Sequence, residues 1–123
     1  ANPLSMKQSI LNLSNIKNNN HKYVLLGDML ELGKFSKKLH KEAAKTVNKS
    51  SINKVFVYGR HIKETFNKIK TQKKGKMLNN KEEILKLIKN DLKNNDYLMI
   101  KGSNATGLNK IISKIKLKYS NAL

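Results

Sequence analysis

Residues 23–33 read Tyr-Val-Leu-Leu-Gly-Asp-Met-Leu-Glu-Leu-Gly, and the first six of them decide the fold. Four apolar residues in an unbroken run are expected of a strand that is buried on both faces of a parallel sheet. Gly27 follows the run directly, and a glycine there lets the backbone turn sharply. Asp28 then stands at the strand end, where a carboxylate can accept hydrogen bonds from a ribose, face a metal-bound phosphate or accept loop amides. The residue types alone leave these three roles open.

Similar apolar runs recur along the chain, at residues 55–57 and 97–100, with a weaker one at 77–78. Between them, apolar residues repeat with helical period in five segments, with stripes at Met6–Leu13, Leu39–Val47, Ile62–Ile69, Ile84–Leu92 and Leu108–Ile115. Residues 73–75 are predicted to form a loop, and Asn80 with Glu83 resembles a capping box at a helix start. The alternation predicts an α/β fold of three layers, a mostly parallel sheet with helices on both faces.

Strand ends of a parallel sheet gather at one edge, where such sheets bind ligands. Three junctions should therefore share that edge: Gly27-Asp28, Tyr58-Gly59 and residues 101–103 (Lys-Gly-Ser). A mobile cation, a glycine and a hydroxyl beside a helix start suit a carboxylate or phosphoryl group. The alternative interpretation is a capped helix start with a surface lysine, in which Ser103 or Thr106 is the cap. The segment is not a nucleotide-binding P-loop, because Leu108-Asn109 stands where Lys-Ser/Thr would be needed.

The formal net charge of +18 admits two interpretations. A strongly basic chain can bind nucleic acid or an anionic membrane. However, Arg60 is the only arginine, the lysines are spread along every segment, and the densest run at residues 73–76 has no aromatic neighbour. Nucleic-acid sites favour arginine and interleaved aromatics. We therefore favour a solvated basic surface and keep a basic nucleic-acid-binding module as the alternative.

Other chemistries find little support in the sequence. There is no cysteine, and no apolar stretch approaches the ~18 residues of a membrane span, so we expect a cytoplasmic protein. His21, His40 and His61 lie in different segments, and only eight carboxylates are present, so no metal site is predicted. We expect His40 to be a structural or surface residue rather than a base.

Four segments carry a family resemblance. Residues 1–6 (Ala-Asn-Pro-Leu-Ser-Met) look like the end of a Tyr-Asn-Ala-Asn-Pro-x-Ser-Met segment, and residues 27–33 match Gly-Asp-Met-x-Glu-Leu-Gly in full. Ser36 with Leu39-His40, and residues 99–103, match the helix and the terminal Lys-Gly-Ser that follow. These motifs, in this order, resemble the C-terminal domain of the Mur ligases, in the branch that joins D-alanyl-D-alanine to UDP-N-acetylmuramoyl-tripeptide.

The resemblance implies that residues 1–123 form a single Rossmann-like C-terminal domain of a three-domain, ATP-dependent peptide ligase of peptidoglycan synthesis. By that similarity, the central domain carries the phosphate-binding loop and the Mg²⁺ ligands, and the C-terminal domain closes the site around ATP and the dipeptide. We therefore expect this chain to be a fragment that is inactive alone and holds no cofactor by itself. Its expected partners are ATP, the UDP-N-acetylmuramoyl-tripeptide and D-alanyl-D-alanine, with no membrane, and nucleic acid is not favoured.

The resemblance also assigns roles to individual residues. Asn2 would approach the adenine or ribose, and Asp28 would line the nucleotide side of the cleft. Lys101, the catalytic candidate, and Ser103 would face the incoming dipeptide or the acyl phosphate. Asn104 stands where the family usually has arginine, so this substrate contact would be made otherwise or more weakly.

Overall fold

The computed structural model describes residues 3–17, 20–29, 36–102, 107–108 and 110–113. In chain order its elements are α1 (Pro3–Asn15), β1 (Lys22–Gly27), α2 (Ser36–Asn48), β2 (Lys54–Tyr58), α3 (Lys63–Asn67), a 3₁₀ turn η2 (Thr71–Lys73), β3 (Lys74–Leu78), α4 (Lys81–Lys86), a π-helical turn η3 (Leu87–Asp91) and β4 (Tyr97–Lys101). Leu108 and residues 110–113 are also helical. No helix in these ranges is long and apolar enough to span a membrane.

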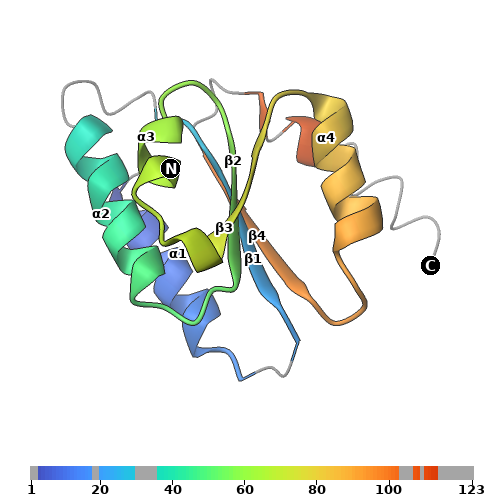
Figure 1. Ribbon diagram of the computed structural model, residues 1–123, viewed down its shortest axis with the longest axis horizontal. Helices are drawn as coiled ribbons and strands as arrows, with labels where there is room; N and C mark the ends of the chain where they lie inside the picture. The colour runs from blue at the N-terminus through green and yellow to red at the C-terminus, as the bar shows by residue number, and fades with distance from the viewer. Residues whose placement is uncertain (1–2, 18–19, 30–35, 103–106, 109, 114–123) are drawn as a thin grey trace.

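The four strands form one parallel sheet in the order β3-β2-β1-β4 (Figure 1). β1 pairs with β2 on one side, where Val24 lies opposite Val55, and with β4 on the other, where Leu26 lies opposite Lys101. The chain thus steps outward from β1 to β3 and then crosses back to the far side of β1. Open parallel sheets bind ligands at such a reversal, beyond the carboxyl ends of the two strands that flank it.

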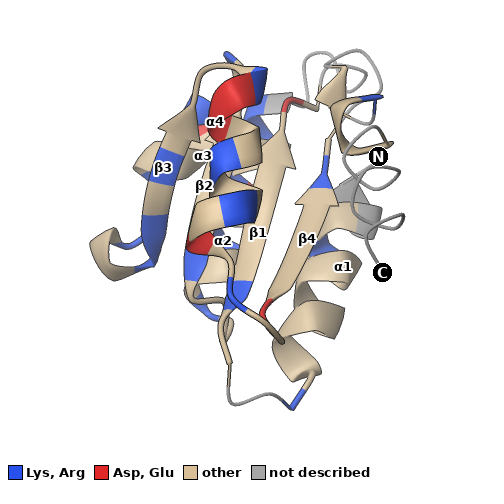
Figure 2. Ribbon diagram, turned by 90° about the vertical axis from the view of Figure 1, so that its right-hand side faces the viewer, with Lys and Arg blue, Asp and Glu red and all other residues tan. Residues whose placement is uncertain are grey.

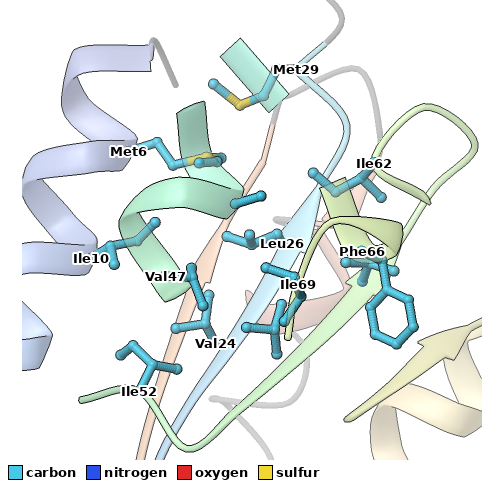
Figure 3. Close-up of a cluster of buried hydrophobic side chains, with 14 of the residues drawn as sticks. Met6, Ile10, Val24, Leu26, Met29, Val47, Ile52, Ile62, Phe66 and Ile69 are labelled. Atoms are coloured by element: carbon cyan, nitrogen blue, oxygen red, sulfur yellow. The ribbon is translucent and has the colours of Figure 1, made fainter. Parts of the chain in front are cut away.

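Helices cover both faces of the sheet, as the sequence predicted (Figure 1). On one face Val24 and Leu26 join a core that α1, α2 and α3 complete, and Figure 3 shows Met6 and Ile10 of α1 on this side of the sheet. On the other face Leu25 packs in a second core with α4 and Leu108. Because successive residues of a strand point to opposite faces, one apolar run supplies both cores.

β3 is longer than its two predicted residues, and the predicted loop at 73–75 was wrong for Lys74 and Gly75, which lie in the strand. The physical reason is packing against β2. A Cβ at position 75 would lie 2.7–2.8 Å from three ring atoms of Phe56. Glycine therefore serves here to admit the Phe56 ring rather than to make a turn.

The capping box at the start of α4 is confirmed with a shift of one residue. The Asn80 side chain accepts a hydrogen bond from the Glu83 N–H at 2.9 Å. The Glu83 carboxylate accepts in return from the Asn79 N–H at 2.8 Å, rather than from that of Asn80. Two amide donors at the helix start are thereby satisfied.

Polar side chains tie down the amino end of the sheet. Lys22 is 5% exposed, and its Nζ donates to the Ser14 carbonyl oxygen at 2.8 Å and to Ser51 Oγ at 3.1 Å. Asp96 accepts hydrogen bonds from the His21 N–H at 3.0 Å and the Lys93 N–H at 2.9 Å. The Lys22 contacts join β1 to the end of α1 and to the segment before β2, and the Asp96 contacts join the turns that precede β1 and β4.

Gly75→Ala should lower the free energy of unfolding by about 1–3 kcal/mol, because the added methyl overpacks the Phe56 ring. Urea unfolding measures the change. Lys76→Ala, at an exposed position of the same strand, is the control and should change stability by less than about 0.5 kcal/mol. Equal effects of the two substitutions would show that the ring does not restrict this position.

Stability should fall in acid partly through Asp96. The hydrogen bond from the Lys93 N–H, with that from His21, lowers the pKa of Asp96 below its ordinary value of 3.8. The stabilisation is therefore complete above pH 3.8 and is lost as the pH falls through the lower folded-state pKa. Asp96→Asn should be less stable than the parent at neutral pH, and the difference should shrink in acid. Urea unfolding at several pH values tests this, and a constant difference would contradict it.

Candidate functional site

The described residues of the three predicted junctions lie at one edge of the sheet. Gly27 at the end of β1 pairs with Tyr58 at the end of β2, and Leu26 pairs with Lys101 at the end of β4. Figure 2 shows the strands running in one direction, with their arrowheads at the same edge. This edge contains the topological reversal between β1 and β4, so it is the candidate site.

The ends of β1 and β4 approach each other backbone to backbone. A Cβ at Gly102 would lie 3.0 Å from the Gly27 Cα, and a Cβ at Gly27 would lie 3.2 Å from Leu108 Cδ2. Both distances are tighter than ordinary van der Waals contact, so side chains at these positions would push the turns apart. The two glycines thus let the half-buried Lys101 and the Asp28 turn end side by side.

Asp28 holds the loop that follows β2. Its side chain is 5% exposed, and its two oxygens accept hydrogen bonds from the Arg60 N–H at 3.0 Å and the Ile62 N–H at 2.7 Å. Gly59 has φ = +137°, and a Cβ there would lie 2.6 Å from Asp28 Oδ1. Of the three roles left open by the sequence, the structure shows the acceptor of loop amides.

Beside Asp28 the same loop borders a pocket of about 360 Å³. Tyr58 and Arg60 from the end of β2, Lys63 of α3 and Asn79 beyond β3 contribute to its walls. Sequence analysis did not propose Arg60 or Lys63 as site residues. The available signal was that the chain's one arginine directly follows a predicted strand-end glycine.

The remaining predicted site residues, Asn2, Ser103 and Asn104, lie outside the described residues. Among those that are described, no group of three or more His, Asp or Glu side chains is placed to hold a metal ion. Of the predicted site residues, Asp28 and Lys101 are described, and they lie at the carboxyl ends of the neighbouring strands β1 and β4.

His40 has a structural setting. It is 2% exposed on α2, and burial lowers the pKa of its imidazole, while the charges of Asp28 and Glu64 act in the opposite direction. Its carbonyl oxygen accepts a hydrogen bond from Thr65 Oγ1 at 2.9 Å, which links α2 to α3. A buried imidazole with a lowered pKa is neutral at pH 7, so His40 packs the two helices rather than supplying a charge.

Residues 1–104 match the family described as "Mur ligase, glutamate ligase domain". The chain belongs to the Mur ligase family. Among curated relatives, it is 36% identical over 124 aligned residues to a UDP-N-acetylmuramoyl-tripeptide–D-alanyl-D-alanine ligase from Buchnera aphidicola, covering 99% of this chain and 26% of that protein. The ligase of the same name from Bacillus subtilis is 29% identical, with 94% and 26% covered. The chain thus spans about a quarter of the length of these relatives.

Solved structures support the fold. MurF ligase from Thermotoga maritima, solved in complex with ADP, matches with a TM-score of 0.76 and 23% identity over 100% of this chain and 27% of that one. MurF from Acinetobacter baumannii matches with a TM-score of 0.67 and 20% identity, covering 93% and 25%. The Rossmann-like α/β prediction is confirmed, and these matches give no support to the nucleic-acid-binding alternative.

Asp28→Ala should free the loop after β2. Losing a buried, charged acceptor of two N–H bonds should cost about 2–4 kcal/mol of stability. In hydrogen-exchange measurements, the Arg60 and Ile62 amides should exchange faster than in the parent. The increase should exceed what the lower free energy of global unfolding produces at other amides. Asp91→Ala, at an exposed position, is the control. Unchanged relative protection of the two amides would mean that Asp28 does not hold this loop.

Proposed function

We propose that this chain is the C-terminal domain of an ATP-dependent ligase that joins D-alanyl-D-alanine to UDP-N-acetylmuramoyl-tripeptide in peptidoglycan precursor synthesis. The observation that carries the proposal is the 36% identity, over 99% of the chain, to a ligase of that name. The fold adds support, because Asp28 and Lys101 flank the reversal of strand order where parallel sheets bind ligands.

The reaction proceeds in two steps. The terminal carboxylate of the tripeptide attacks the γ-phosphorus of ATP, which gives an acyl phosphate and releases ADP. The free amine of the dipeptide then attacks the acyl carbon, the carbon–oxygen bond to the phosphate breaks, and an amide and inorganic phosphate result. The proton that the amine loses passes to a base or to water. Mg²⁺ would screen the ATP phosphates, with its ligands on the part of the ligase outside this chain.

In this scheme the chain closes over reactants that the rest of the ligase binds. Lys101 supplies a positive charge at the end of β4 and, with Ser103, would face the dipeptide or the acyl phosphate. Asn104 would take part in the same substrate contact. Asn2 and Asp28 would face the nucleotide, and because the Asp28 carboxylate already accepts two loop amides, its role there would be to position the loop. Closure orders the reactants and excludes water that would hydrolyse the acyl phosphate.

The direct test uses the protein expressed from the whole reading frame that contains these residues. With ATP, Mg²⁺ and the tripeptide, it should release phosphate and form the pentapeptide product when D-alanyl-D-alanine is supplied, and the 123-residue chain alone should not. Product is identified by mass spectrometry, since phosphate release alone does not show which amide formed. No product with the dipeptide, from a folded protein that binds ATP, would refute the proposal. The nucleotide-linked substrate makes the cytoplasm the expected location.

Lys101→Ala in that full-length protein should lower kcat by about 10²-fold, because a cation placed at developing charge acts mainly in the transition state. The stability of the variant should change by less than about 1 kcal/mol, since Lys101 is only half-buried. Lys110→Ala, at an exposed helical position beyond β4, removes the same charge and is the control. Equal kcat values for Lys101→Ala and the parent would remove Lys101 from the chemistry.

A further inference from the structure

The pocket beside Asp28 lies on the opposite side of β1 from Lys101. Its walls come from the ends of β1, β2 and β3, whereas Lys101 ends β4. It therefore lies at a different part of this edge of the sheet from Lys101. At about 360 Å³ it is large enough for a group of several heavy atoms.

The framework of this pocket is fixed before any ligand arrives. The Asp28 carboxylate accepts hydrogen bonds from the backbone N–H groups of Arg60 and Ile62, and at Gly59, with φ = +137°, a Cβ would lie 2.6 Å from the same carboxylate. The backbone that carries Arg60 is thus held by two hydrogen bonds to a residue that is 5% exposed. A loop that is already ordered loses little conformational entropy on binding.

The charges that remain available at the pocket are positive. Arg60 and Lys63 are exposed, so their head groups can reach a ligand. Asp28 is the acidic residue of the wall, and both its oxygens already accept amide hydrogens. Glu64, the nearest acid along the chain, borders a different pocket, with Lys37, Lys38, Lys41 and Lys68. An anionic group would therefore meet two cations here.

The arginine at position 60 restricts the kind of ligand that this pocket would bind. Every other cationic residue among the 26 Lys and Arg is lysine. A guanidinium differs from an ammonium in presenting a planar fork of N–H donors that pairs with two oxygens of a carboxylate or a phosphate at once. Such a fork, on a residue that lines the pocket and in a loop that the Asp28 carboxylate holds, is suited to an oxyanion that carries two or more equivalent oxygens.

We propose that this pocket is an oxyanion subsite in which Arg60, assisted by Lys63, binds a carboxylate or a phosphate of a substrate. The inference rests on the proposed function for the identity of that substrate. Two sources share the chemistry, the terminal carboxylate of D-alanyl-D-alanine and a phosphate of the nucleotide. In either case Arg60 would bind and orient the substrate.

Binding can be measured without ligase activity, by NMR titration of the 123-residue chain at physiological salt. The probes are D-alanyl-D-alanine, its C-terminal amide, which lacks the carboxylate, inorganic phosphate and ADP. We expect localised shifts at the Arg60, Ile62 and Asn79 amides, and about tenfold weaker binding for Arg60→Gln. Lys45→Gln, exposed on α2, removes the same charge elsewhere and should leave the affinity unchanged. Shifts with the dipeptide and not its amide identify the carboxylate, and shifts with phosphate or ADP identify the nucleotide.

The subsite is refuted if no probe shifts these amides, or if Arg60→Gln and Lys45→Gln weaken binding equally. Kinetics of the full-length protein give a second measurement. Arg60→Gln should raise the KM for the dipeptide or for ATP about tenfold, for the source that NMR identifies, with kcat changed less. If the ligase assay fails but the localised shifts persist, only the proposed function is lost. If the ligase is active and Arg60→Gln leaves both KM values unchanged, the subsite is wrong and the function stands.

Discussion

β1 lies between β2 and β4, and its burial on both faces is the constraint from which the rest of the architecture follows. Val24, Leu25 and Leu26 are each 0% exposed. Because their side chains alternate between faces, each face needs its own helical cover, and α1–α3 and α4 provide it. A strand buried in this way also needs neighbours on both edges for its backbone groups, which places the chain reversal beside it. The position of the functional edge is thus a consequence of core formation.

The two ends of the sheet use buried charge for related purposes. At the amino end, Lys22 donates a hydrogen bond to the Ser14 carbonyl oxygen, and Asp96 accepts hydrogen bonds from the His21 and Lys93 N–H groups. At the carboxyl end, Asp28 does the same for the loop after β2. The difference is that Gly27, Gly59 and Gly102 place no side chains at the carboxyl end. The exposed cations there therefore lie on a backbone that approaches its neighbours closely and is held by hydrogen bonds. Binding groups on such a framework are held more precisely than on a free loop.

Much of the fold followed from local patterns in the sequence. The run at residues 23–26 predicted β1, and the stripe of Met6, Ile10 and Leu13 predicted α1, because each pattern matches the period of one secondary structure. The start of β3 was harder to predict, because Lys74 and Gly75 have the local pattern of a loop. Their place in the strand is explained by the Phe56 ring, which occupies the space beside Gly75. That contact joins residues 19 positions apart, and no local pattern reports it.

The site was predicted less completely than the fold. The sequence placed Asp28 and Lys101 at one edge, because parallel strands end together. It did not show that Asp28 would use both oxygens on loop amides, since that depends on how residues 59–62 fold around it. Arg60 was noticed as the only arginine but was not connected with Asp28, 32 residues away along the chain. Pairings set by loop conformation are decided by tertiary structure.

The placement of lysine on β3 has a consequence for how these molecules behave in concentrated solution. β3 is an edge strand of the sheet, and an edge strand can pair with the sheet of another molecule. Lys74 and Lys76 lie on this strand, in a chain whose formal net charge is +18. Two such edges that approach each other bring like charges together, and the repulsion extends over a screening length of about 10 Å at 0.1 M salt. Dilute salt should therefore keep the molecules apart, and concentrated salt should remove that protection against edge-to-edge aggregation.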